Sequence, residues 1–219
     1  GSTTSNVTRP VGIQGSGLTP DTSHIYNNFV TGIRKGYTGV TATATVSLVG
    51  LRSTQQGGAG IVNWSYNTVY LSSVSPVYYS SCAYASFGGG VVMNVADNIF
   101  YNNISTANAT ARSVAIQDGN AAVPSGFLKS NYNDLFSPGT NGAVGLNGAA
   151  TFSTTLANWT TANPLLDINS SNVVVNFVNT AIGNLHLTGA SVGDIALLGT
   201  EIPGITTDID GDIRGVKPY

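Results

Sequence analysis

The chain has 219 residues, of which 42% are hydrophobic, so it is long enough to form one domain with a sizeable core. Only 8% of the residues are charged, and the formal net charge is −2 at pH 7. Helical proteins fill their exposed faces with Lys, Glu, Arg and Gln, whereas this chain uses Ser, Thr, Asn and Gly instead. The composition therefore argues against an α-helical fold, against disorder and against a basic surface that binds nucleic acid.

The sequence also argues against a small fold held together by disulfides and against a membrane-spanning helix. The single cysteine, Cys82, cannot form an intrachain disulfide. No apolar run reaches the roughly 18 residues that a membrane-spanning helix needs, so we expect no membrane insertion. The first residues, Gly1–Ser5, lack the basic start and apolar stretch of a signal peptide, and we interpret them as the end of a processed chain or as a cloning remnant.

Four segments of the chain share an asparagine that is followed two positions later by a large apolar residue. The pairs are Asn28/Val30, Asn67/Val69, Asn98/Phe100 and Asn133/Leu135. Successive anchor asparagines lie about 30 to 40 residues apart, which is within the range of solenoid repeats. Because Asn tolerates the left-handed backbone region, we expect each anchor to end a turn and start a strand.

The repeat also predicts how the strands are held together. If each coil places its anchor above the previous one, then Asn28, Asn67, Asn98 and Asn133 form a ladder of hydrogen-bonded side-chain amides. Such ladders stabilise parallel strands that are in register. The apolar residue two positions after each anchor then points in the same direction and fills the interior.

Other segments are predicted to be strands because they alternate apolar and polar residues or are rich in β-branched residues. The strand candidates are Thr45–Val49, Gly88–Val95, Ser113–Gln117 and Asn172–Val178, and one short helix fits Thr154–Trp159, where Thr would cap it. Short strands without an intervening helical pattern are otherwise typical of a sandwich or barrel. The asparagine repeat favours coils stacked along one axis.

The chain resembles a known group of proteins in several of these segments. Its asparagine-anchored coils are similar to those of right-handed parallel β-helix repeat proteins of the pectin-lyase-like superfamily, and especially to large secreted surface proteins of the Bacteroidetes and Ignavibacteria type. The segments that carry the resemblance are Tyr66–Ser72, Ala96–Asn103, Ala162–Leu166, Asn184–Leu187 and Gly204–Gly215.

The resemblance extends from about Gly12 to Pro218. It implies an all-β fold, namely a single-stranded right-handed parallel β-helix, or solenoid, with asparagine-anchored turns. Residues 1–219 would form one domain, in which residues 160–219 are the closing C-terminal coils. The resemblance also implies that the protein is secreted or lies at the cell surface. It does not by itself imply an enzymatic activity, because this fold serves many functions.

Carboxylates are the first place to look for catalysis. Glycosidases of this fold use two or three Asp residues at a defined separation. Asp97 and Asp134 each adjoin an anchor asparagine, so we expect them at equivalent turns of successive coils, where turn capping is the simpler interpretation. The two histidines, His24 and His186, suggest no nucleophilic triad, so no catalytic residue is assigned.

One local cluster of acids suggests a metal ion. Asp208, Asp210 and Asp212 alternate with other residues around a glycine, which allows carboxylates to converge on calcium. The alternative is that Arg214 offsets these acids in a turn that closes the end of the fold. No other cofactor is predicted.

The sequence favours a non-catalytic extracellular structural module, such as a cell-surface stalk, an adhesin or a fibre subunit that associates with itself end to end. The alternative is a module that binds surface glycans, or a polysaccharide lyase or glycoside hydrolase of the β-helix type, in which Tyr78, Tyr79 and Trp159 stack on sugar rings. The threonine array Thr41–Thr45 supports an ice-binding surface as a minor alternative.

Overall fold

The computed structural model is mostly β, with one α-helix and three short 3-10 helices in the part of the chain that it describes. The described residues are 10–15, 21–33, 48–54, 60–72, 79–86, 91–106, 112–119, 128–148 and 151–215. Within them no helix is long and apolar enough to cross a lipid bilayer.

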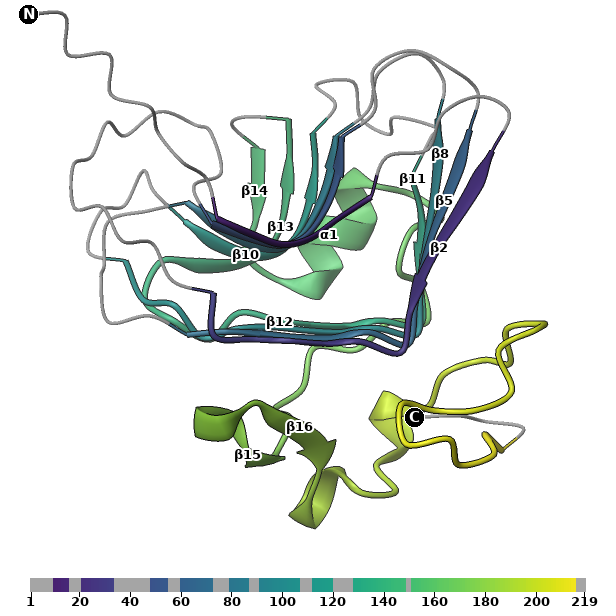
Figure 1. The fold of residues 1–219 in the computed structure, drawn as a ribbon. Helices are drawn as coiled ribbons and strands as arrows, with labels where there is room; N and C mark the ends of the chain where they lie inside the picture. Colours follow the sequence, from purple (N-terminus) through teal and green to yellow (C-terminus); the bar gives the residue numbers. More distant parts are fainter. Residues whose placement is uncertain are drawn as a thin grey trace, which may run out of the picture.

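Three parallel sheets form the body of the protein, and the chain passes through sheets A, B and C in turn before it repeats the circuit (Figure 1). Sheet A contains β1 (Val11–Gly15), β4 (Leu48–Thr54), β7 (Ser80–Ser86), β10 (Ser113–Asp118), β13 (Gly142–Asn147) and β14 (Thr151–Ser153). Sheet B contains β2 (Thr22–Tyr26), β5 (Ile61–Ser65), β8 (Val92–Ala96) and β11 (Leu128–Asn131). Sheet C contains β3 (Phe29–Val30), β6 (Thr68–Leu71), β9 (Ile99–Asn102) and β12 (Asp134–Phe136).

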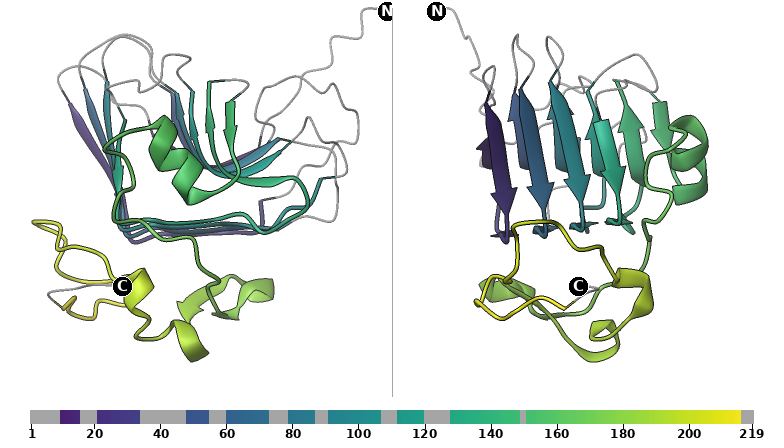
Figure 2. Two further views of the ribbon diagram at one scale, coloured as in Figure 1. Left: turned by 180° about the vertical axis from the view of Figure 1, so that it is seen from behind. Right: turned by 90° about the vertical axis from the view of Figure 1, so that its right-hand side faces the viewer.

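Each circuit makes one coil, and each coil stacks on the next (Figure 2). Strands of neighbouring coils pair in parallel and in register, for example Trp64 with Val95 in sheet B and Val69 with Phe100 in sheet C. This arrangement of stacked parallel sheets fits a β-helix or solenoid, and it agrees with the all-β expectation from the sequence.

The bend between sheet B and sheet C occurs at a single left-handed residue in every coil. These residues, which we call the turn column, are Asn27, Tyr66, Asp97 and Tyr132, with φ values of 55°, 54°, 58° and 56°. The expectation that the anchor asparagine itself is left-handed is therefore wrong by one position. The anchor must direct its amide along the stack, so the preceding residue makes the bend.

The anchor asparagines form a continuous ladder of hydrogen bonds. The Nδ2 of Asn28 donates to Oδ1 of Asn67 at 2.8 Å, Asn67 donates likewise to Asn98 at 2.9 Å, and Asn98 donates to Asn133 at 3.0 Å. At the last rung, Asn133 donates to Oδ1 of Asp167 at 3.2 Å. The backbone N–H of Asn67 also donates to Oδ1 of Asn98, which fixes the direction in which these amides point.

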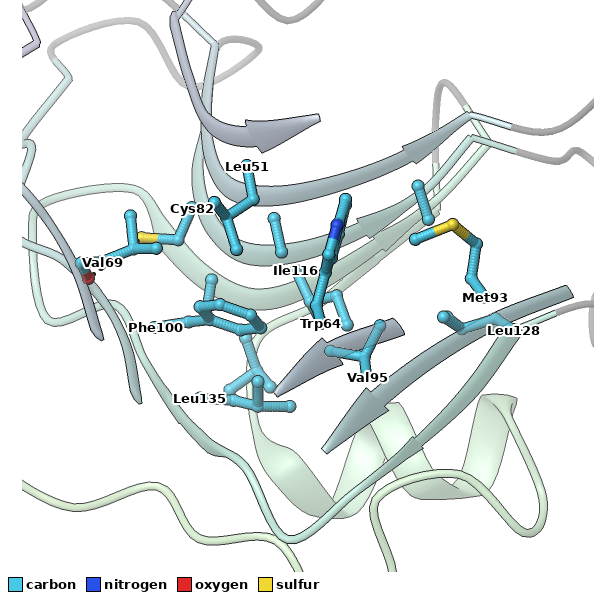
Figure 3. Packing of buried hydrophobic residues seen from close by; sticks show 14 of the residues in the cluster. Leu51, Trp64, Val69, Cys82, Met93, Val95, Phe100, Ile116, Leu128 and Leu135 are labelled. Carbon is cyan, nitrogen blue, oxygen red and sulfur yellow. Dashed lines mark hydrogen bonds between the residues drawn. The ribbon is translucent and has the colours of Figure 1, made fainter. Parts of the chain in front are cut away.

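Apolar side chains fill the space between the sheets (Figure 3). The residues two positions after the anchors, Val30, Val69, Phe100 and Leu135, are all buried, as the repeat predicts. Helix α1 (Leu156–Ala162) lies at the C-terminal end of the core and buries Trp159 completely. The ring of Trp159 packs where a side chain on Gly145 would be, because a Cβ there would lie 2.1 Å from the ring.

The sequence places the helix correctly to within a few residues. It begins after Thr155, whose side chain caps it by accepting a hydrogen bond from the N–H of Asn158 at 3.1 Å. Ser113–Gln117 lies in β10 as predicted, but β10 is buried on both faces, because Val114, Ala143, Leu146 and Phe152 form a second apolar cluster.

The strand predicted at Asn172–Val178 is largely absent, since only β15 (Phe177–Asn179) forms there. Ser171 pairs with Asp134 in the last strand of sheet C, but Asn172 and Val173 bond to β12 through side chains and do not continue the strand ladder. The closing coils expected over residues 160–219 are not seen beyond this bridge, because residues 174–215 add no strand to the stacked sheets. Beyond it, the chain runs outside sheet C, with β15 antiparallel to β16 (Asn184–Leu187) and with the 3-10 helices Thr180–Ile182, Gly189–Ser191 and Ile195–Leu197 (Figures 1 and 2).

The amide ladder gives a direct prediction about stability. We expect Asn98→Leu to lower the free energy of unfolding by about 3 kcal/mol, because the buried donors and acceptors of its neighbours lose their partner. Asn94→Leu is the matched control, since Asn94 bonds to Asn63 on the partly exposed outer face of sheet B, and it should cost less than about 1 kcal/mol. Urea denaturation measures both, and equal losses would contradict a special role for the ladder.

Candidate functional site

Residues 174–215, the C-terminal segment, are fastened to the turn column. Tyr66 donates from its hydroxyl to the carbonyl of Thr200 at 2.7 Å and accepts from the N–H of Ile202 at 3.1 Å. In the next coil, Oδ1 of Asp97 accepts from the N–H of Thr200 at 2.7 Å. The outward side chains of two successive bends thus hold the same part of the segment.

Arg214 makes the corresponding connection at the end of the segment. Its guanidinium group lies 3.9 Å from the centroid of the Tyr66 ring and donates to Oδ1 of Asn27 at 2.9 Å. Asn27 donates in turn to the carbonyl of Thr207 at 2.7 Å. The charge of Asp208 also acts on Arg214, as the interpretation that Arg214 offsets the acid cluster expects, and Arg214 in addition bonds to Asn27 and to the carbonyl of Thr207.

Aromatic side chains fasten the first part of the segment to the outer face of sheet C. Tyr70, Tyr101 and Phe136 stand side by side on three successive strands, with ring centroids 5.4 and 5.0 Å apart. Phe177 of β15 covers Tyr70 and Tyr101 at 5.7 and 5.9 Å. The hairpin of β15 and β16 therefore packs on an aromatic surface.

A pocket of about 180 Å³ lies between the turn column and the C-terminal segment. Its walls combine apolar, polar and charged side chains. The residues that line it are Phe29, Tyr66, Asn67, Thr68, Asp97, Ile99, Leu185, His186, Leu187, Asp208, Ile209 and Arg214. The charged groups are engaged with the protein itself, since Arg214 holds Asn27 and His186 pairs with Asp210.

Asp97 is the most perturbed acid of this pocket. It is 8% exposed, and its Oδ2 has no hydrogen-bond partner among the described residues. Burial raises its pKa from 3.8 to about 7, although the N–H of Thr200 and the charge of Arg214 oppose this shift. The carboxyl group is therefore partly protonated near neutral pH.

Asp134 is buried under the same segment but in a different position. Its Oδ1 accepts hydrogen bonds from Ser171 Oγ and from the N–H of Val173, both at 2.9 Å, and burial raises its pKa to about 6. Asp97 precedes its anchor, whereas Asp134 follows its anchor and pairs with Ile99 in sheet C. The expectation that the two acids occupy equivalent turns is therefore wrong.

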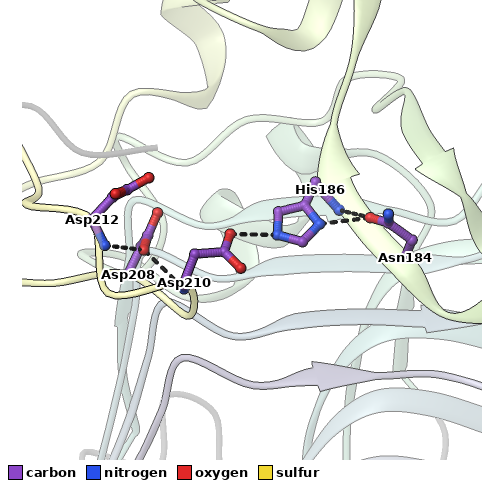
Figure 4. A network of polar contacts seen from close by, with 5 residues as sticks. All are labelled: Asn184, His186, Asp208, Asp210 and Asp212. Atoms are coloured by element: carbon purple, nitrogen blue, oxygen red, sulfur yellow. Dashed lines mark hydrogen bonds and ion pairs between the residues drawn. The ribbon is translucent and has the colours of Figure 1, made fainter.

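The predicted calcium cluster forms a hydrogen-bonded loop (Figure 4). Oδ1 of Asp208 accepts from the N–H groups of Asp210 and Asp212, both at 2.9 Å. Oδ2 of Asp210 lies 2.6 Å from Nε2 of His186, whose Nδ1 lies 2.6 Å from Oδ1 of Asn184. Within the described ranges, no three His, Cys, Asp or Glu residues converge as a metal site would require.

The outer face of sheet B carries a row of polar side chains that sequence analysis missed. Nδ2 of Asn94 donates to Oδ1 of Asn63 at 2.6 Å, and Asn63 lies 3.3 Å from Nδ1 of His24. Lys129 pairs with Asn94 in the next strand. A signal was present, because each of these residues lies four positions before its anchor asparagine.

Two adjoining hollows, of about 680 and 550 Å³, follow this row and share Asn94 and Ala96. We call them together the sheet B groove. One wall is residues 202–205 of the C-terminal segment, and the other is residues 164–166. Tyr26 lines the groove and is 48% exposed.

Of the three aromatic residues expected to stack on sugars, the two that the structure describes are buried. Trp159 is in the core, and Tyr79 is 8% exposed and stacks on Phe152. Tyr78 and the threonine array Thr41–Thr45 lie outside the described residues.

No protein-family model, curated protein or solved structure matches this chain.

The raised pKa of Asp97 predicts a pH-dependent stability. Because the folded state holds this proton between about pH 4 and pH 7 and the unfolded state does not, the contribution of Asp97 to stability falls as the pH rises through this range. Asp97→Asn keeps the acceptor for Thr200 but carries no charge. We expect its free energy of unfolding, relative to that of the native chain, to rise by on the order of 2–4 kcal/mol between pH 4 and pH 8. Denaturation at several pH values measures this. Asp212→Asn, at an exposed position, is the control, and parallel pH profiles for all three proteins would contradict the assignment.

The loop at Asp208 predicts how the protein responds to calcium. Since Asp208 and Asp210 are bonded to loop N–H groups and to His186, we expect neither EDTA nor millimolar calcium to shift the unfolding temperature by more than about 1 °C. Thermal scans check this, and a rise with calcium that Asp208→Asn abolishes would restore the calcium site.

Proposed function

We propose that the chain is a right-handed parallel β-helix that serves as a non-catalytic structural module outside the cell, as a stalk or adhesin at the cell surface. The right-handed assignment follows from the strong preference of parallel crossover connections for that hand. The resemblance to β-helix surface proteins of the pectin-lyase-like superfamily supports the same proposal.

The observation that carries the proposal is the unbroken amide ladder from Asn28 to Asp167. It connects the coils of the stack through hydrogen bonds that are buried or partly buried, and such an arrangement suits a rigid scaffold. The acids and bases at the pocket support the same view, because Asp97, His186 and Arg214 all bond to parts of the chain that hold the C-terminal segment in place.

The geometry favours a stalk or adhesin over a fibre subunit, because the C-terminal end of the stack is closed. β14 pairs antiparallel with β13, and the N–H of Asp167 donates to the carbonyl of Ser130 in β11 at 2.7 Å. At β12, Leu135 donates to the carbonyl of Ser171 at 2.9 Å. A head-to-tail fibre needs two open ends, whereas at this end residues 167 and 171 occupy the edges of β11 and β12, and sheet A ends in an antiparallel strand that a parallel coil would not match.

Antibody labelling of intact source cells tests the proposed location. We expect an antibody raised against the purified chain to label cells without permeabilisation, and brief protease treatment of intact cells to remove the label. Incubating the purified chain with acidic and neutral polysaccharides should release no new reducing or unsaturated ends. Labelling that requires permeabilisation, or turnover of a polysaccharide, would contradict the proposal.

The sheet B groove favours glycan binding as a second function. Its row of amide, imidazole and ammonium groups offers hydrogen-bond donors and acceptors along one line, with the exposed ring of Tyr26 beside it. This combination of polar groups and an aromatic face suits a sugar chain.

Affinity electrophoresis in polysaccharide gels tests this second function. If the groove binds, Tyr26→Ala and Lys129→Ala should each weaken retardation about tenfold, which corresponds to the loss of a few favourable contacts. Tyr84→Ala, on sheet A, is the matched control and should leave retardation unchanged. Equal behaviour of all three variants would exclude the groove.

A further inference from the structure

The N-terminal end of the stack differs from the closed C-terminal end. β1, β2 and β3 are the terminal strands of their sheets, and within the described residues no strand pairs with their outer edges. The inward side chains of Ile13 and Ile25 are only half-buried, whereas their partners Leu51 and Trp64 in the next coil are completely buried. Among the described residues, both the strand edges and the apolar interior are thus less covered here than in the next coil.

The direction of the amide ladder specifies what this end accepts. Oδ1 of Asn98 receives hydrogen bonds from both the backbone N–H and Nδ2 of Asn67, which belongs to the preceding coil. Oδ1 of Asn28 has no donor among the described residues. Likewise, Nδ2 of Asn67 donates to the carbonyl of Ile25 in the preceding coil, whereas Nδ2 of Asn28 turns to the carbonyl of Tyr26 in its own coil.

A second copy of the chain does not satisfy this end. In head-to-tail contact it would present its closed end, where the ladder finishes on Asp167, an acceptor already bonded to Asn133, Ser130, Ser170 and Trp159. In head-to-head contact, two Asn28 Oδ1 atoms would face each other without a hydrogen between them. Both arrangements lack the donor that the first rung requires.

We propose that the N-terminal end of the stack binds an extended polypeptide segment that adds as a parallel coil and places an asparagine amide above Asn28. Such a segment completes the ladder, pairs with the edges of β2 and β3, and covers Ile25. This is strand addition with a specific polar requirement, since the added residue must donate from both its backbone and its side chain. The inference deepens the proposed scaffold function and rests on it.

A peptide from the chain itself provides the probe. Gly60–Ser72 forms one complete B-to-C bend with Asn67 as its anchor, and in the protein it already packs beside β2 and β3. We expect the ¹⁵N-labelled full chain to show chemical-shift changes confined to β2, β3 and Asn28 between them when this peptide is added at about 1 mM. The same peptide with Asn67→Asp should bind about tenfold more weakly, because a carboxylate cannot donate to Asn28.

Three results would overturn the inference. They are the absence of shifts at that concentration, equal binding of the Asn and Asp peptides, and shifts located away from the N-terminal coil. A scrambled peptide controls for nonspecific association. These outcomes are separate from failure of the scaffold proposal, which the cell-surface labelling and polysaccharide incubations test without any added peptide.

Discussion

The directional hydrogen bonding of stacked asparagine amides is the constraint on which the rest of the structure depends. Each rung donates towards the C-terminal end and accepts from the N-terminal side, so the stack has a polarity that the sheets alone do not impose. Because the anchor directs its side chain along the stack, the bend falls on the residue before it. The outward side chains at the bends, Tyr66 and Asp97 among them, then hold the C-terminal segment. One residue type at one position thus organises the interior, the bends and the outer layer.

The ladder and the buried apolar residues were predictable because both follow from local repetition in the sequence. The turn column was not, since Asn27, Tyr66, Asp97 and Tyr132 share a backbone conformation but no common chemistry. The path of the C-terminal segment was also hidden, because its contacts join positions very distant in sequence, such as Thr200 with Asp97 and Arg214 with Asn27. The acid cluster at Asp208 suggested a metal because of its spacing. Spacing alone does not reveal that N–H groups of the same loop already bond to the Asp208 carboxylate.

The outer faces of two sheets have taken different roles. Sheet C carries an aromatic row that the β15–β16 hairpin covers. Beside it, Asp97 and Asp134 are buried under the C-terminal segment. Sheet B keeps a polar row that remains open between two walls of the same chain. The C-terminal segment therefore serves both faces, since it shields the aromatic one and supplies residues 202–205 as a border of the polar one.

The connections between coils vary widely in length, and the stretch from β3 to β4 is much longer than that from β12 to β13. Register nevertheless remains constant, because the rungs and the paired strands set it and the connecting segments do not. Insertions and deletions between sheets C and A therefore leave the coil geometry unchanged. In such a fold the loops between sheets C and A can diversify rapidly during evolution. They also offer protein engineers positions at which foreign loops can be grafted at a defined spacing.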